Sequence, residues 1–324
     1  MRELTKGQFD IIIDYCRQLF LKKNQDYGTS WRILRLSSIT DQIYIKALRI
    51  RSIQEKGVQK IDEDISDEFD ATALNEDKWH IQGKGGLYHS NFIGRPPSQF
   101  STDNVRIEDG KLKIQTRWEP NYPFSPTHHP SSGEAFENIT TAAVIGNKHF
   151  RYGYMEIKCK SANAPITSSF WTTSNTGEVH KSELDMFEMF GGHKTSEAWR
   201  KRLKLNIISW DNQNPYYQPT YNGPTYSDNI QVNHNTADDF HVYGFEWSPE
   251  YIKVYVDGVL HPDGDIMKDL VTLGGTDNDR WITDVPYKIW FDSETFPWLG
   301  LPTASDLVEP AEYQIEYIRV WQKS

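Results

Sequence analysis

Cysteine is scarce in this chain of 324 residues, which contains Cys16 and Cys159 and no other cysteine. The two lie far apart, in segments of different character, so we expect two free thiols and no disulfide. No cluster of cysteine and histidine has zinc-ligand spacing, and no glycine-rich loop has the pattern that cradles a phosphate. The sequence therefore offers no disulfide framework, no common zinc site and no nucleotide-phosphate loop.

Long apolar runs are also missing. No stretch approaches the roughly 20 consecutive apolar residues that a membrane-spanning helix needs. The first residues lead into an amphipathic segment rather than into the apolar region of a secretory signal, so no signal peptide is visible. We therefore expect no membrane partner.

Positive charge is in short supply as well. The formal net charge is −10, which disfavours a nucleic-acid partner. The balance is uneven, because residues 1–60 carry 12 basic and 6 acidic residues, whereas the remainder carries 23 and 39. This contrast predicts two parts, an N-terminal helical hairpin extension over residues 1–62 and a main domain over residues 63–324.

The N-terminal part has helical periodicity. Residues 8–24 predict an amphipathic helix, and a second helix is expected from about Thr40 to Gly57. The runs at 26–35 and 41–43 resemble the opening of small all-α proteins associated with nucleotide modification. That similarity covers only these two helices, which are too few to form an active site of that kind. We therefore favour a helical appendage or a fusion remnant over a nucleotide-processing enzyme.

The main domain has the pattern of strands. Asp109-Gly110 and Asp257-Gly258 each separate two alternating segments, which is a hairpin signal. Further strands are expected at residues 152–160, 183–190, 203–210, 241–247, 287–291 and 313–321. We predict an all-β fold, an antiparallel β-jelly-roll sandwich whose two stacked sheets leave one face curved into a groove, preceded by a short N-terminal helical extension.

Three carboxylates stand within an otherwise apolar and aromatic run at residues 182–190. Side chains alternate along a strand, so Glu183 and Asp185 share a face, whereas Glu188 would lie on the other. A one-residue bulge would bring all three to one face. Crowded carboxylates repel each other, which raises at least one pKa. An ionised nucleophile with a protonated acid about 5–5.5 Å away is what a retaining glycosidase needs.

This trio resembles the E-x-D-x-x-E signature of glycoside hydrolase family 16, a family of β-jelly-roll enzymes. Further matches, in the same order as in the family, are the segments 67–79, 243–247 and 313–321. The resemblance implies that Glu183 is the nucleophile and Glu188 the acid/base. It also implies that Asp185 orients and tunes the nucleophile.

The segment 292–303 resembles the red-algal galactan branch of that family, which comprises porphyranases, agarases and carrageenases. Candidate substrate-binding residues in this reading are Trp171, Glu246, Trp247, Glu294 and Trp298. Sulfate esters call for arginine donors, for which Arg95, Arg117 and Arg200 are candidates. Core packing is the alternative for the aromatic residues, and solvated surface or an ordinary ion pair is the alternative for the arginines.

The sequence thus predicts a retaining endo-β-glycosidase that hydrolyses β-1,4-galactosidic linkages in a porphyran- or agar-type galactan. A laminarinase-type endo-β-1,3-glucanase and a non-catalytic carbohydrate-binding jelly roll are the alternatives. The resemblance implies a polysaccharide partner and a place outside the cell or at its surface, and we expect a monomer. No cofactor is expected to be required, although the family often carries a structural calcium ion whose ligands the sequence does not assign.

Overall fold

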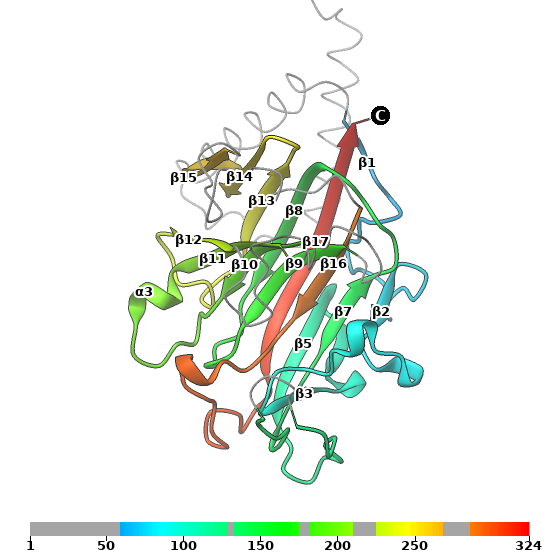
Figure 1. Cartoon of the computed structure of the whole chain (residues 1–324), viewed down its shortest axis with the longest axis vertical. Coiled ribbons are helices and arrows are strands. Elements are labelled where there is room, and N and C mark those ends of the chain that lie inside the picture. Colours follow the sequence, from blue (N-terminus) through cyan, green and yellow to red (C-terminus); the bar gives the residue numbers. More distant parts are fainter. Residues whose placement is uncertain (1–58, 129–132, 175–181, 210–224, 268–285, 324) are drawn as a thin grey trace, which may run out of the picture. The chain divides into compact units, whose positions relative to one another are not determined.

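The computed structural model describes residues 59–128, 133–174, 182–209, 225–267 and 286–323 (Figure 1). The chain divides into two units, Met1–Ser52 and Ile53–Ser324. The first unit lies outside the described residues, and so do Cys16 and the two predicted N-terminal helices. Cys159 is a buried free thiol, as predicted.

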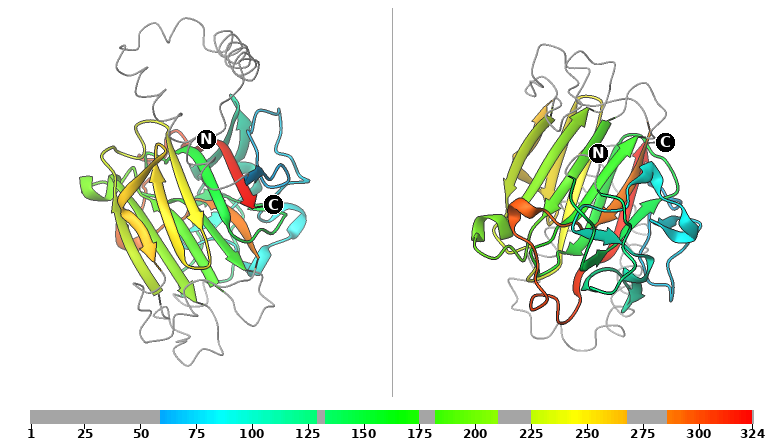
Figure 2. Two further views of the ribbon diagram at one scale, coloured as in Figure 1. Left: turned by 90° about the horizontal axis from the view of Figure 1, so that it is seen from above. Right: turned by 60° about the horizontal axis from the view of Figure 1, so that its bottom comes forward.

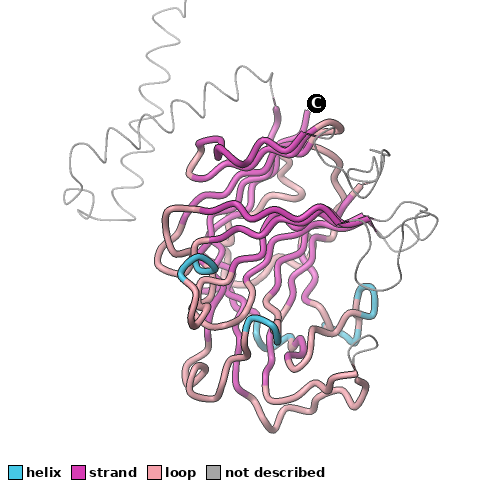
Figure 3. Tube along the Cα trace, turned by 60° about the vertical axis from the view of Figure 1, so that its left-hand side comes forward, coloured by secondary structure: helices cyan, strands magenta, loops and turns pink. Residues whose placement is uncertain are grey.

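Strands make up the body of the second unit and form two sheets packed face to face, with short helices in the connecting loops (Figures 2 and 3). The described strands of the first sheet run in the order β15-β14-β13-β8-β17-β5-β6-β3, with β1 added beside β17 and β4 beside β5. Those of the second sheet run in the order β12-β11-β10-β9-β16-β7-β2. Among these described strands every pairing is antiparallel except that of β3 with β6, so the predicted jelly-roll sandwich is confirmed.

The strands of the first sheet are β1 (Gln59–Ile61), β3 (Ser98–Phe100), β4 (Val105–Glu108), β5 (Lys111–Trp118), β6 (Ile139–Thr141), β8 (Gly153–Lys160), β13 (His241–Trp247), β14 (Tyr251–Val256), β15 (Val259–Met267) and β17 (Ala311–Lys323). Those of the second sheet are β2 (Trp79–Ile81), β7 (Ala143–Gly146), β9 (Ser168–Ser174), β10 (Ser182–Met189), β11 (Arg202–Ser209), β12 (Thr225–Gln231) and β16 (Tyr287–Asp292). The helices are α3 (Glu197–Arg200), η2 (Lys84–Gly86), η3 (His89–Asn91), η4 (Thr102–Asn104) and η7 (Pro297–Leu299). None of these described helices has the length and apolarity needed to cross a bilayer.

The core lies between the sheets and follows the alternation of the strands. Ile157 and Tyr243 contribute from the first sheet, and Leu184, Ile207 and Phe291 from the second. Side chains of opposite parity point away from the core. Each sheet therefore has an outer face.

The predicted hairpins and strands are confirmed. Positive φ angles at Asp109, Gly110, Asp257 and Gly258 form the tight turns between β4 and β5 and between β14 and β15. The six further predicted strands agree with the structure to within two residues at each end. The predicted boundary at residue 62 stays a prediction, and β1, which precedes it, pairs with β17.

We expect Gly153→Ala to destabilise the fold. Gly153 has a φ of +133°, and a Cβ there would lie 2.4 Å from the carbonyl oxygen of Trp321 in β17. Strain and clash together should lower the free energy of unfolding by about 3 kcal/mol, measured by urea denaturation.

Gly85→Ala is the matched control. Gly85 also has a positive φ, +64°, but a Cβ there meets no atom within 4 Å. The control should cost only backbone strain, about 1 kcal/mol. Equal losses in the two variants would show that the approach of β17 to Gly153 does not matter.

Candidate active site

Strand β10 carries a bulge at Met186. Asp185 pairs with Trp171 of β9, and the next pair in the register joins Phe187 to Phe170, so Met186 is an extra residue. The pairing of β10 with β11 shows the same shift. The bulge predicted from the sequence is thereby confirmed.

The bulge decides which side chains face the core. Met186 and Phe187 are consecutive, yet both are buried in the core, with exposed fractions of 1% and 0%. The alternation is thereby reset after Asp185. As a result Glu183, Asp185 and Glu188 share the outer face of the second sheet.

Strand β11 supplies hydrogen-bond donors to two of these carboxylates. Asn206 lies opposite Asp185, and Lys204 lies opposite Glu188. Nδ2 of Asn206 donates to Oδ2 of Asp185 at 2.7 Å and to Oε2 of Glu188 at 3.1 Å. Nζ of Lys204 donates to the same Oε2 of Glu188 at 2.7 Å. The two strands are thus joined through their polar side chains as well as their backbones.

Asp185 is a buried carboxyl with a perturbed pKa. Its side chain is 7% exposed, and this burial raises its pKa well above the ordinary value. The charges of Glu183 and Glu188 raise the pKa further, while Asn206 and Lys204 oppose the shift. The surroundings therefore favour the protonated form of Asp185.

Strands β9 and β16 add aromatic and acidic side chains to this face. Trp171, opposite Asp185, stacks on Trp290 with 4.5 Å between the ring centroids. Its Nε1 donates to Oδ2 of Asp292 at 2.7 Å. Burial, followed by the charge of Glu294, raises the pKa of Asp292 well above the ordinary value.

Glu294 and Arg95 form an ion pair near the trio. Nε of Arg95 lies 3.2 Å from Oε2 of Glu294, and the guanidinium lies 4.5 Å from the ring centroid of Phe296. Burial raises the pKa of Glu294, Arg95 lowers it, and the charge of Glu188 raises it again. The influence of Glu188 indicates that this ion pair lies within electrostatic reach of the acid trio.

Trp298 is an exposed aromatic side chain next to the end of β10. It is 58% exposed, and its ring packs edge-on against Trp199 and Phe190 at centroid distances of 5.4 and 6.1 Å. Phe190 directly follows β10. The ring of Trp298 is therefore exposed to solvent close to the end of β10 that carries Glu188.

Residues 60–323 match the family described as "Beta-porphyranase A-D, GH16 domain". The chain belongs to glycoside hydrolase family 16. Residues 23–73 also match the family described as "Nucleotide modification associated domain 1", in line with the resemblance of the N-terminal part.

Relatives of this family 16 domain include enzymes of two specificities. β-Porphyranase B of Phocaeicola plebeius is 28% identical over 278 residues, which cover 76% of this chain and 78% of that protein. A β-glucanase of Acetivibrio thermocellus is 36% identical over 194 residues, which cover 59% of this chain and 45% of that protein. The crystal structure of porphyranase B from Zobellia galactanivorans superimposes with a TM-score of 0.64 at 22% identity, over 82% of this chain and 92% of that one.

Two of the predicted substrate-binding residues lie in the other sheet of the family 16 domain. Trp247, in β13, is a core residue that stacks on Tyr287 at 4.7 Å. Glu246 lies on the outer face of the first sheet, where the hydroxyls of Tyr251 and Tyr255 each donate to it at 3.0 Å. The structure therefore does not bring Glu246 or Trp247 to the face of the acid trio, because β13 belongs to the first sheet.

Two of the predicted arginines also lie elsewhere. Arg117, in β5, lies on the outer face of the first sheet, where its Nε donates to Oε1 of Gln115 at 3.2 Å. Arg200, at the end of α3, donates to the backbone carbonyls of His193 at 2.6 Å and Lys194 at 3.0 Å. Of the predicted sulfate-binding arginines, the structure brings Arg95 near the trio and does not bring Arg117 or Arg200 there.

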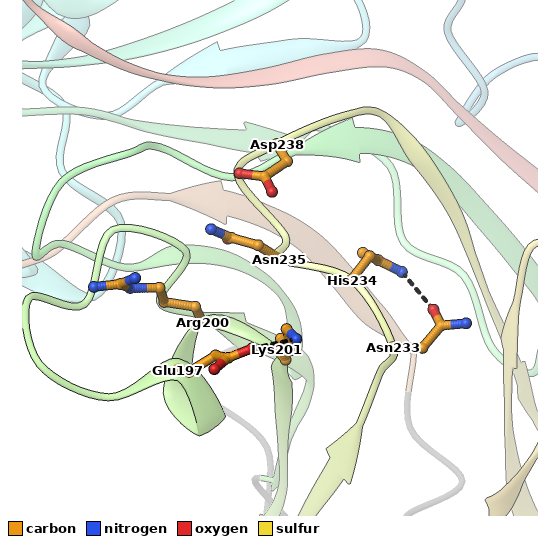
Figure 4. Close-up of a pocket in the computed structure, with 7 residues that line it drawn as sticks. All are labelled: Glu197, Arg200, Lys201, Asn233, His234, Asn235 and Asp238. Atoms are coloured by element: carbon orange, nitrogen blue, oxygen red, sulfur yellow. Dashed lines mark hydrogen bonds and ion pairs between the residues drawn. The ribbon is translucent and has the colours of Figure 1, made fainter.

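Arg200 instead lines a polar pocket of about 360 Å³ beside α3 (Figure 4). Within it Lys201 pairs with Glu197 at 2.5 Å, and His234 hydrogen-bonds Asn233 at 3.1 Å. The other lining residues are Asn235 and Asp238. The pocket includes none of the side chains around the acid trio.

Four further residues of this face were not predicted from the sequence, namely Lys204, Asn206, Trp290 and Asp292. A signal for the first two was present, because Arg202, Lys204 and Asn206 alternate with apolar residues in a strand that was itself predicted. What the sequence did not contain was the pairing of that strand with β10.

Within the described residues no group of three or more His, Cys, Asp or Glu side chains is arranged to hold a metal ion. The carboxylates of Asp185 and Glu188 accept instead from β11. The structural calcium ion that the family resemblance implies stays a prediction.

We expect Asp185→Asn to stabilise the protein at neutral pH. The fold raises the pKa of Asp185 above the value of about 3.9 that it has in the unfolded chain. Ionisation of Asp185 therefore lowers the free energy of unfolding as pH rises from about 3.9 to the pKa of the folded protein. The amide avoids this cost, so the variant should melt about 2–4 °C higher at pH 7 for each kcal/mol recovered. The difference should vanish near pH 3, where both states are protonated.

Asp306→Asn is the control, because the fold lowers the pKa of this carboxyl and the substitution should therefore destabilise the protein. Although burial raises the pKa of Asp306, hydrogen bonds from Lys194 and Thr303 lower it to about 2. The control should melt lower than the wild type at pH 7 and approach it as pH falls toward 2. Both variants are measured by thermal unfolding across this pH range. If Asp185→Asn were stabilising only at acid pH, the pKa of Asp185 would not be raised by the fold.

Proposed function

We propose that this protein is a retaining endo-β-glycosidase that hydrolyses β-1,4-galactosidic linkages in a red-algal galactan of porphyran or agar type. The observation that carries the proposal is the bulge in β10, which puts Glu183, Asp185 and Glu188 on one face of a family 16 jelly roll. In this proposal Glu183 is the nucleophile, Glu188 is the acid/base, and Asp185 orients and tunes the nucleophile.

The electrostatics of the trio suit this division of roles. The raised pKa of Asp185 favours a protonated carboxyl between two others on the same strand. A protonated Asp185 can donate a hydrogen bond to Glu183 and so stabilise the ionised nucleophile. Glu188 lies beyond the bulge, so it approaches a bound sugar from a different point along the strand than Glu183 does.

An anionic galactan fits the other side chains on this face. Arg95 places a cationic group near the trio, and Arg202 lies on the outer face of β11 with its guanidinium 3.9 Å from the ring centroid of Trp199. Sulfate esters are bound by such donors. Trp171 and Trp298 are the rings that we propose stack on sugars.

A laminarinase-type endo-β-1,3-glucanase is the second candidate, and the similarity to a β-glucanase over 194 residues favours it. The substrate distinguishes the two, since both would use the same three carboxylates. A non-catalytic carbohydrate-binding jelly roll would need neither Glu183 nor Glu188. Both are present on one face, which supports an enzyme.

We also propose where the enzyme acts and what it requires. A polymeric substrate is met outside the cell or at its surface, and we propose this localisation with the polysaccharide as the partner. We further propose that the protein acts as a monomer and requires no cofactor, since two carboxyl groups suffice for double displacement.

Reducing-sugar release from porphyran, agarose, κ-carrageenan and laminarin tests the proposal. We expect the wild type to cut porphyran or agarose, and Glu183→Gln and Glu188→Gln each to lower kcat by about 1,000-fold or more. Glu312→Gln, on the outer face of the first sheet, is the control and should keep wild-type turnover. Cleavage of laminarin alone would select the glucanase, and binding without turnover would select the non-catalytic module.

Trp298→Ala should weaken substrate binding with little effect on chemistry. Loss of one stacking ring, worth about 0.5–1.5 kcal/mol, should raise KM about 2- to 10-fold at nearly constant kcat. Val259→Ala removes an exposed apolar side chain from the first sheet and should change neither constant. An unchanged KM in Trp298→Ala would remove this residue from the substrate-binding set.

A further inference from the structure

The two oxygens of the Glu188 carboxyl have different surroundings. Nζ of Lys204 and Nδ2 of Asn206 both donate to Oε2, at 2.7 and 3.1 Å. An ionised carboxylate oxygen has about two lone pairs that can accept hydrogen bonds. These two donors from β11 therefore occupy the accepting capacity of Oε2.

The donors are themselves held in place by a closed network. Nζ of Lys204 also donates to Oδ1 of Asn206 at 3.2 Å, which fixes the orientation of that amide. With Oδ1 facing the ammonium, Nδ2 of Asn206 reaches both Oε2 of Glu188 and Oδ2 of Asp185. Lys204 thus holds Glu188 directly and also through Asn206.

This arrangement restricts where Glu188 can carry a proton. A proton on Oε2 would point an O–H group at two N–H donors and would break at least one of their hydrogen bonds. A proton on Oε1 leaves both bonds intact. We infer that Lys204 and Asn206 are positioning residues that reserve Oε1 of Glu188 as the oxygen that gives and takes the proton.

The inference rests on the proposed function and adds an atom to its mechanism. In the first step the proton leaves Oε1 for the glycosidic oxygen as the C1–O bond breaks, the electron pair goes to that oxygen, and a Glu183 oxygen bonds C1. In the second step a water gives a proton to Oε1 and its oxygen bonds C1, while the bond to Glu183 breaks and returns its electron pair to that carboxylate. Lys204 touches neither the sugar nor the water in this scheme.

The test compares substrates that need the proton with substrates that do not. We would measure kcat/KM, which reports bond cleavage in the first step, on an oligosaccharide of the polymer that the wild type cuts. The second substrate is a 2,4-dinitrophenyl glycoside of the matching disaccharide, whose leaving group departs without a proton. The variants are Lys204→Met, Lys204→Arg and Glu188→Gln.

If the inference is correct, Lys204→Met lowers kcat/KM on the oligosaccharide about 10- to 100-fold, part of the usual contribution of general acid catalysis, and changes it less than about 3-fold on the dinitrophenyl glycoside. Lys204→Arg keeps a donor and should recover much of the loss. Lys158→Met, which breaks an ion pair with Glu316 in the first sheet, is the matched control and should leave both substrates unaffected. Melting temperatures show that each variant is folded.

The failure of the inference is distinct from the failure of the proposed function. If the wild type cuts the polymer and Glu188→Gln does not, the function stands. Equal losses of Lys204→Met on both substrates, or no loss on either, would then overturn the positioning role alone. A wild type that cuts none of the polymers would overturn both.

Discussion

One extra residue in one strand, Met186 in β10, is the constraint on which the site depends. It lets two consecutive side chains, Met186 and Phe187, enter the core, where each contributes roughly 1.5–3 kcal/mol of burial. In a regular strand Phe187 would face outward and Glu188 would enter the core, where an unpaired carboxylate is far more costly than a solvated one. Core packing and the position of Glu188 therefore favour the same register, so the hydrophobic free energy that folds the sandwich also places the acid trio.

Strand β11 gives the acids of the trio different electrostatic surroundings. Asn206 bridges Asp185 and Glu188, whereas the ammonium of Lys204 donates to Glu188 and to Asn206. Asp185 is left buried between two carboxylates with one amide donor, which is why its pKa rises. Lys204 and Asn206 are two residues apart in β11. Because of the bulge, they lie opposite Glu188 and Asp185, which are three residues apart in β10.

The sequence sufficed for features that depend on neighbours along the chain. The Asp-Gly turns, the strand limits and the bulge all follow from local spacing, because alternation and turn chemistry act over a few residues. The assignment of strands to sheets depends on pairings between distant segments, which alternation does not encode. The sheet to which Glu246 and Trp247 belong could not be predicted for this reason, since β13 alternates in the same way whichever sheet it joins. Lys204 was not predicted because its partner in β10 is set by register.

Two equally buried acids, Glu246 and Asp185, have opposite electrostatic surroundings. Glu246 in the first sheet accepts from two tyrosine hydroxyls, and burial together with this carboxylate raises the pKa of Tyr251 to about 12. Its charge is thus met by two donors that keep their protons at any ordinary pH. Asp185 in the second sheet is equally buried but faces Glu183 and Glu188, so its charge is opposed. The two acids thus differ in the charges around them rather than in burial, and the repulsion around Asp185 adds to burial in favouring its protonated form.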